Sequence, residues 1–181
     1  MSQSLVLAST SPRRKELLEQ IGVVFTQLSI NITEDVAEGE NPEQYVLRLA
    51  KEKAIAGFNL LSVTEKDNCV VLAADTTVVC NGQILAKPES LSHSKEILAQ
   101  LSGCEHIVMS AIGLHSKDKT VQKVVTTRVM FRNISDAEIE AYWHSGEPQD
   151  KAGSYGIQGL GAVFVESITG SYSNVVGLPL C

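Results

Sequence analysis

Cys-Val-Val-Leu-Ala-Ala-Asp-Thr-Thr-Val-Val-Cys, residues 69–80, is the stretch of sequence that decides the fold. The residues before Asp75 are apolar enough for a strand that is buried on both faces, as at the centre of a sheet in an α/β protein. Asn81-Gly82 follows at once, and this dipeptide is the strongest short-range signal for a hairpin turn. Residues 83–86 are therefore expected to return as a second strand.

Asp75 stands inside this otherwise apolar strand. A carboxylate in such a place needs a hydrogen-bonding partner, a metal ion or a catalytic role, because burying an unpaired charge is costly. One interpretation is a structural aspartate that bonds to neighbouring backbone. The other, given equal weight, is a functional aspartate that binds a divalent cation or orients a water molecule for attack on phosphorus.

Outward from this strand, segments with strand and helix patterns follow one another along the chain. Ser11-Pro12, Asn41-Pro42 and Ser135-Asp136 each carry the signals of a helix start. We expect further strands over 5–8, 23–28, 107–114, 121–131 and 161–168, and helices over 12–21, 42–56, 94–101 and 136–144. Hairpins mixed with helices predict the α/β class, with a mixed, twisted sheet and flanking helices.

Length and composition predict a single domain over residues 1–181, without a repeat or a flexible linker. The net charge of −6 argues against a broad nucleic-acid surface. No apolar run approaches the ~20 residues of a membrane span, and the N-terminus lacks a signal-peptide pattern. The four cysteines have no metal-ligand spacing and are expected to be free thiols. We therefore expect a cytoplasmic protein that binds neither membranes nor nucleic acid.

Residues 9–15, Ser-Thr-Ser-Pro-Arg-Arg-Lys, place three cations in the first turn of a predicted helix. The N-terminus of a helix already carries a partial positive charge and unpaired N–H groups. The cations oppose the helix dipole unless an anion is present, so we favour an anion-binding site over a solvated basic turn. Ser9, Arg13 and Arg14 are its candidate ligands.

Three further charged residues complete a set that is typical of phosphoryl chemistry. Glu34 lies in a polar, acidic loop over 31–40, and Lys53 lies on the helix that follows this loop. Lys87 closes the hairpin that begins with the strand of Asp75. Each alone reads as a surface charge, but together they offer carboxylates for a metal ion and amines for phosphates.

Residues 147–161 carry four glycines, at 153, 156, 159 and 161, around Tyr155 and Gln158. Such spacing lets backbone approach a flat ligand, and an amide side chain can read the edge of a base. The alternative is a glycine-rich connection without a ligand. From the residues alone this block is a weak signal for ligand binding.

Taken together, these segments resemble the Maf family of nucleoside triphosphate pyrophosphatases. The matching blocks keep the family order and cover almost the whole chain, so that jointly they are highly specific. The blocks are 7–18, 48–50 with 53–54, 74–76, 87–88, 101–103, 127–131, 147–148 with 150–153, 155–159 and 173–180.

The resemblance implies two lobes around a deep cleft, a fold similar to that of inosine triphosphate pyrophosphatases, and a homodimer. It implies that Asp75 is the catalytic proton acceptor and that Glu34, Lys53 and Lys87 are cleft residues. It also implies a divalent metal ion, Mg²⁺ or Mn²⁺, for which Asp75 and Glu34 are the expected ligands. Ser9, Arg13 and Arg14 match the phosphate side of the site.

Three positions indicate the subtype within the family. The subtype that acts on dTTP and UTP has Arg, Thr and Gln at these positions. This chain agrees at all three, with Arg13, Thr76 and Gln158. The alternatives are a pyrophosphatase for 7-methyl-GTP or other modified nucleotides and a nucleotide-sensing regulator of septum formation. Most members continue into a further helix where this sequence has Cys181, a difference expected to affect the C-terminal lobe more than the chemistry.

Overall fold

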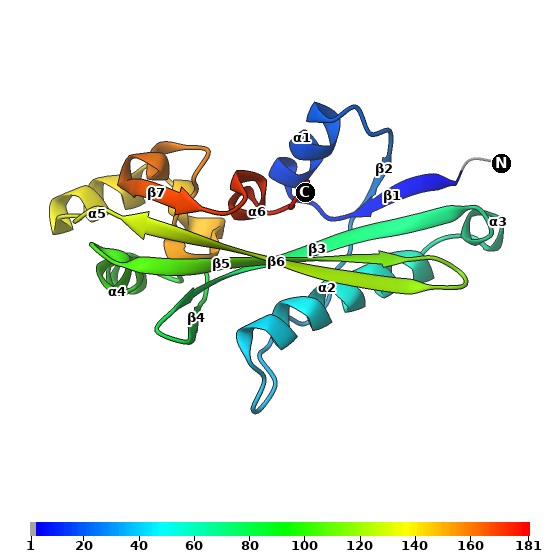
Figure 1. Cartoon of the computed structure of the whole chain (residues 1–181), viewed down its shortest axis with the longest axis horizontal. Coiled ribbons are helices and arrows are strands. Elements are labelled where there is room, and N and C mark those ends of the chain that lie inside the picture. Colours follow the sequence, from blue (N-terminus) through cyan, green and yellow to red (C-terminus); the bar gives the residue numbers. More distant parts are fainter. Residues whose placement is uncertain (1–2) are drawn as a thin grey trace.

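The computed structural model describes residues 3–181, which form one mixed sheet with helices on both faces (Figure 1). The strand order is β2-β1-β3-β5-β6-β7, and β4 pairs with β3. Strands β1, β2 and β3 are mutually parallel, and the remaining pairs are antiparallel. The strands are β1 Ser4–Ala8, β2 Thr26–Leu28, β3 Cys69–Cys80, β4 Gln83–Leu85, β5 Glu105–His115, β6 Thr120–Phe131 and β7 Val165–Thr169. The predicted α/β class with a mixed sheet is confirmed.

The helices divide between the two faces and one end of the sheet. Helix α2 lies along one face, α1 and α6 lie on the other, and α4 and α5 pack together at the end where β7 lies (Figure 1). The helices are α1 Pro12–Gln20, α2 Pro42–Asn59, α3 Val63–Lys66, α4 Leu91–Leu101, α5 Asp136–His144 and α6 Tyr172–Val176, with 3₁₀ turns at Glu147–Asp150, Ala152–Ser154 and Leu160–Phe164. Within residues 3–181, no helix has both the length and the apolar character that crossing a membrane requires.

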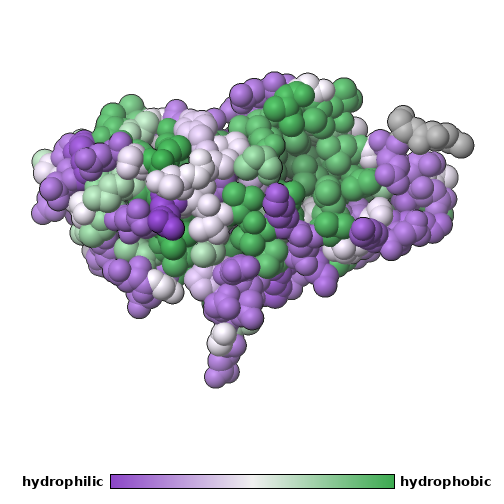
Figure 2. Space-filling model, in the orientation of Figure 1, coloured by the Kyte–Doolittle hydropathy of each residue, from purple (hydrophilic) through white to green (hydrophobic). Residues whose placement is uncertain are grey.

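The central strand β3 is buried on both faces, as its sequence predicts. Val71 and Ala73 pack with the apolar side of α2, whereas Leu72 and Ala74 pack with residues of α1 and α6. Figure 2 shows hydrophobic residues gathered over α1 and the strands beside it. Because side chains alternate along a strand, Asp75 and Thr76, the next two residues of β3, are directed to opposite faces of the sheet.

One edge of β3 is left without a strand partner in its middle. Strand β5 pairs with β3 from Val71 to Val79 on the other edge. On the near edge, β1 pairs with residues 69–72 and β4 with residues 78–80, so the described strands leave residues 73–77 uncovered there. In open α/β sheets, ligands bind in the crevice at the carboxyl ends of strands, and β1 ends beside this gap. The fold therefore presents Asp75 at a natural opening.

Helix α2 lies unusually close to the sheet. A Cβ atom at Gly113 on β5 would approach within 2.5 Å of the carbonyl oxygen of Ala50, so only glycine fits there. The close approach brings Lys53, one turn further along α2, down onto β3. Asn41 caps this helix with a capping box formed with Gln44, which confirms the expected helix start.

Several boundaries differ from the sequence-based expectations. The strand expected over 23–28 is limited to Thr26–Leu28, because Val23 and Phe25 pack against the core cluster beside α1 instead of pairing. The strand expected over 161–168 is wrong in its first half, since residues 160–164 form a 3₁₀ turn and β7 begins at Val165. Helix α4 starts three residues before the expected Ser94, because Ser90 caps it.

Candidate active site

A cleft of about 880 Å³ opens at the uncovered edge of β3. Its walls come from the turn between β1 and α1, the loop before α2, the hairpin of β3 and β4, the block over 150–158 and the end of α6. A volume of this size suits a small-molecule ligand. The cleft brings together every site residue that the sequence predicts, namely Ser9, Arg13, Arg14, Glu34, Lys53, Asp75, Thr76, Lys87 and Gln158.

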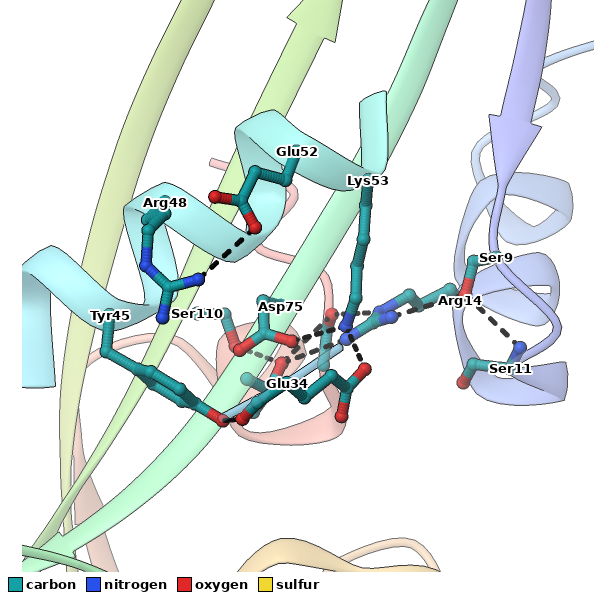
Figure 3. A network of polar contacts seen from close by, with 12 residues as sticks. Ser9, Ser11, Arg14, Glu34, Tyr45, Arg48, Glu52, Lys53, Asp75 and Ser110 are labelled. Carbon is teal, nitrogen blue, oxygen red and sulfur yellow. Dashed lines mark hydrogen bonds and ion pairs between the residues drawn. The ribbon is translucent and has the colours of Figure 1, made fainter. Parts of the chain in front are cut away.

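Lys53 bridges two carboxylates at the floor of the cleft (Figure 3). Its Nζ lies 2.6 Å from Oδ1 of Asp75 and 2.6 Å from Oε1 of Glu34. Asp75 is 6% exposed and Lys53 is 8% exposed. Removing one partner from a buried ion pair typically costs about 3–5 kcal/mol, because the other charge is left uncompensated. The three side chains therefore form one cluster, in which the position of each depends on the others.

The two carboxylates of this cluster differ in proton affinity. Burial raises the pKa of Asp75 above its ordinary value, although the charges of Lys53 and Arg14 act against the rise. Burial also acts to raise the pKa of Glu34, but the hydrogen bond and charge of Lys53, together with Lys87, outweigh it and lower this pKa. Neighbouring acids with pKa values displaced in opposite directions are typical of acid–base sites. Asp75 is the better proton acceptor of the two.

The N-terminus of α1 faces the cleft from the other side of β3 without a side-chain cap. Ser11 occupies the N-cap position, as expected, but its side chain makes no capping hydrogen bond. Its backbone N–H instead donates to Oγ of Ser9, at 3.2 Å. The first turn holds no acidic residue. The backbone donors and positive dipole end of this helix are therefore available to an anion.

Arg14 is held in place by neutral acceptors alone. Its Nε donates to the carbonyl oxygen of Gly177 at 2.9 Å, and its terminal nitrogens donate to Oγ of Ser9 at 3.2 Å and to Oγ1 of Thr76 at 3.4 Å. Among residues 3–181, no carboxylate lies within 4.0 Å of this guanidinium. Burial lowers the pKa of Arg14, with the more distant Asp75 acting against the fall. A partly buried cation without a counter-ion is a strong indication of an anion site.

The other two predicted cations have looser partners. Arg13 lies 3.6 Å from the carboxylate of Asp150, and Nζ of Lys87 lies 3.9 Å from Oε2 of Glu34. Lys87 and Asp150 are both largely exposed. Exposed ion pairs of this kind contribute about 0–1 kcal/mol, so a polyanion can displace the carboxylates at little cost.

Two polar residues of the site were not predicted from the sequence. The hydroxyl of Tyr45 donates to the backbone oxygen of Glu34 at 2.9 Å, which holds the acidic loop over the cleft (Figure 3). Tyr45 lies eight residues before Lys53 on α2, and that helical spacing is the signal that could have shown the two on one face. Ser110 on β5 shares a hydrogen bond of 2.8 Å with Thr76, a pairing that only the strand register reveals.

The block over 147–161 forms the wall of the cleft that carries Gln158, whose side chain is exposed. Its four glycines also pack closely against the protein itself. A Cβ atom at each of the four would meet protein atoms, from Val78, Lys151, Glu147 or Tyr142. The packing of the block itself therefore favours glycine at these positions.

The expected metal ligands, Asp75 and Glu34, do lie together. Among the described residues, no group of three or more His, Cys, Asp or Glu side chains is placed to hold a metal ion. Both carboxylates nevertheless converge on a single ammonium group, that of Lys53. Two carboxylates that leave the rest of the shell to phosphates and water suit Mg²⁺, which rarely has a cage built from protein alone.

Comparisons with known proteins place the chain beside one family. A model of the family described as Maf-like protein matches residues 4–181. A dTTP/UTP pyrophosphatase of Vibrio vulnificus (strain YJ016) is 53% identical over 176 residues, which are 97% of this chain and 92% of that protein. One of Colwellia psychrerythraea is 51% identical over 179 residues, 99% of this chain and 84% of that protein. A solved nucleoside-triphosphatase / dITP/XTP pyrophosphatase of Mycobacterium abscessus matches with a TM-score of 0.44 and 17% identity, covering 71% of this chain and 72% of that one.

Proposed function

The chain belongs to the family of Maf-like proteins, and on this basis we propose that it is a nucleoside triphosphate pyrophosphatase that hydrolyses dTTP and UTP. The products are the nucleoside monophosphate and pyrophosphate. Relatives that are 52% and 53% identical over 97% of the chain are named dTTP/UTP pyrophosphatases.

One observation from the structure supports the proposal most strongly. Arg14, a cation without a carboxylate partner among the described residues, and Asp75, a buried carboxylate with a raised pKa, line the same cleft. The first is suited to bind phosphate and the second to accept a proton. A site that only binds nucleotides needs the cation but has no use for the buried acid, whose ionised form is costly to keep.

In the proposed reaction, a water molecule attacks the α-phosphorus and pyrophosphate leaves. Asp75 accepts a proton from the attacking water, which forms the new P–O bond as the bond to the bridging oxygen breaks. Arg14, Arg13 and Lys87 neutralise charge on the phosphates, because charge that shifts onto the leaving group is stabilised best by cations already in position. Lys53 holds the carboxylates of Asp75 and Glu34 in position beside the substrate.

We include a divalent cation, Mg²⁺ or Mn²⁺, in this proposal. Asp75 and Glu34 would hold it, with oxygens of the triphosphate as further ligands. The fit rests on the donor set, since these two carboxylates already converge on one cation, the ammonium of Lys53. A bound ion of this kind would neutralise phosphate charge and polarise the phosphoryl oxygens.

A panel of nucleoside triphosphates tests the proposal. The purified protein is incubated with Mg²⁺ and each of dTTP, UTP, CTP, dATP, dGTP, ITP and 7-methyl-GTP, and pyrophosphate and monophosphate are measured separately. We expect dTTP and UTP to be hydrolysed at least about tenfold faster than the others, with equal amounts of both products and loss of turnover in EDTA. Release of orthophosphate, or tight binding without hydrolysis, would contradict the proposal, and the second result would favour a nucleotide sensor.

A further inference from the structure

Glu147 lies outside the cleft lining, yet its carboxylate is the centre of the wall that carries Gln158. One oxygen, Oε2, accepts the N–H of Leu160 at 2.7 Å. The other, Oε1, accepts the N–H of Gly161 at 3.0 Å and the hydroxyl of Tyr142 at 2.8 Å. The carboxylate thus satisfies two backbone donors that no strand or helix satisfies. Such charge-assisted bonds to backbone N–H groups are among the stronger hydrogen bonds in proteins.

Tyr142 extends this anchor to the other end of the same turn. Its hydroxyl donates to Glu147 and accepts the N–H of Gly156 at 3.0 Å. The two side chains therefore tie down both Gly156 and Gly161, the residues that flank the turn containing Gln158. Tyr142 itself is buried in the main hydrophobic cluster on α5, so the anchor has a rigid base.

The glycines of the turn show that the anchor is tightly fitted. A Cβ at Gly159 would collide with the carboxylate of Glu147, and one at Gly161 would lie 2.7 Å from the hydroxyl of Tyr142. These distances are shorter than van der Waals contact allows. The chain runs around the two polar side chains with no spare space.

The anchor also reaches the cleft through Lys151, whose Nζ donates to the backbone oxygen of Glu147. Lys151, Gly156 and Gln158 all line the cleft. Burial acts to raise the pKa of Glu147, but the N–H groups of Gly161 and Leu160 outweigh it and lower this pKa. The carboxylate is therefore ionised when the wall is assembled.

We propose that Glu147, supported by Tyr142, is a positioning residue that sets nucleotide discrimination by fixing the turn that presents Gln158 to the base. The proposal rests on the proposed function, because it assigns this wall of the cleft to the base of a nucleoside triphosphate. Glu147 acts through the backbone of residues 156–161 and does not touch the substrate. Its loss should therefore change which nucleotide is accepted more than how fast the bond is broken.

Glu147→Gln tests the proposal, with Glu166→Gln as the matched control. The amide removes the charge and one acceptor, so two backbone donors and a hydroxyl compete for a single oxygen. Glu166 is an exposed acid on β7, and its loss changes the net charge equally. We expect the ratio of kcat/KM for dTTP over dATP to fall about tenfold in Glu147→Gln, the size of one lost charge-assisted hydrogen bond, while kcat changes little.

Two further measurements separate positioning from general damage. Amide hydrogen exchange at Leu160 and Gly161 should be faster in Glu147→Gln and unchanged in the control. In a Gln158→Ala background, Glu147→Gln should add almost nothing to the loss of discrimination, because both act on one contact. If Glu147→Gln fails to fold, Tyr142→Phe replaces it, since that change keeps both backbone bonds to the carboxylate and removes only the hydroxyl. Exchange is then followed at Gly156, whose N–H loses its acceptor.

The outcomes distinguish this proposal from the proposed function. Fast exchange with an unchanged dTTP/dATP ratio would overturn the link to discrimination, and unchanged exchange would overturn the anchor. Additive losses in the double variant would mean that Glu147 does not act through Gln158. If the wild-type protein hydrolyses no nucleotide, the proposed function fails, and the ratio of Kd values for dTTP and dATP then decides the role of Glu147 by the same comparison.

Discussion

The two sides of the cleft are built in different ways. The side with the acid cluster uses mainly residues from regular elements, Asp75 on β3, Lys53 on α2 and Arg14 on α1, with Glu34 added from the loop before α2. The opposite side, over residues 147–161, consists of short 3₁₀ turns and is held by the side chains of Glu147 and Tyr142. The first is rigid because of the sheet, whereas the second is rigid because of a few hydrogen bonds.

This difference matches the demands of the proposed reaction. Bond cleavage needs catalytic groups held to within about 0.5 Å, and strands and helices provide such precision better than loops do. Recognition of a base tolerates variation, and loops on a fixed scaffold are where binding specificity usually changes. A few substitutions in the turn can thus alter the substrate while the chemistry is kept.

Asp75→Asn should produce the largest effect, on the acid side. The amide cannot accept the proton, and we expect kcat to fall about 10³-fold, the typical contribution of a general base. The fold should survive, because Lys53 keeps its ion pair with Glu34. Turnover is measured by pyrophosphate release, and Asp118→Asn, an exposed carboxylate in the turn between β5 and β6, is the control. Turnover at the wild-type rate would remove Asp75 from the mechanism.

Arg14→Gln should follow, with a loss of about 10²-fold in kcat/KM for dTTP, since a partly buried charge–phosphate contact contributes several kcal/mol at most. Arg13→Gln is the matched comparison, because it removes the same charge from the same helical turn. We expect a smaller loss there, as Arg13 is paired with Asp150 and must leave that partner to bind phosphate. Steady-state kinetics on both variants decide the order, and a larger loss at Arg13 would contradict the assignment of Arg14.

Gln158→Ala should have a smaller effect that is limited to the choice of base. We expect kcat/KM for dTTP to fall about tenfold and that for dATP to stay within about twofold, because one neutral hydrogen bond is lost. The side chain is exposed, so the melting temperature should not change. Equal losses for both nucleotides would place Gln158 outside base recognition.

The smallest of these effects should be a shift in the pH dependence of kcat/KM. Asp75 must be ionised to accept a proton, so kcat/KM falls as the pH drops through its pKa, which burial raises above the ordinary value of about 3.9. The charge of Lys53 opposes that rise, and Lys53→Met should therefore move the acidic limb of residual activity to higher pH. Kinetics between pH 4 and 8 measure the shift. A limb that stays in place or moves to lower pH would show that another group controls it.

Much of the fold could be read from local patterns. The central strand, its hairpin and the capped helix α2 were predicted because apolar runs, Asn81-Gly82 and the Asn41 capping box act over a few residues. The strand expected over 161–168 failed in its first half for a non-local reason. The N–H groups of Leu160 and Gly161 bond to the carboxylate of Glu147, at a sequence distance that no local pattern reports.

By itself, the sequence selected the candidate residues of the site. Residue type and position beside helix starts and strand ends, together with the resemblance to the Maf family, pointed to Asp75, Lys53 and Arg14, and all of them line the cleft. Tertiary structure alone decided how they are arranged. Lys53 meets Asp75 across 22 residues because α2 lies close against the sheet at Gly113. Packing distance and strand register arise only when distant segments are brought together. They raised the pKa of Asp75 and, within residues 3–181, left Arg14 without a carboxylate partner.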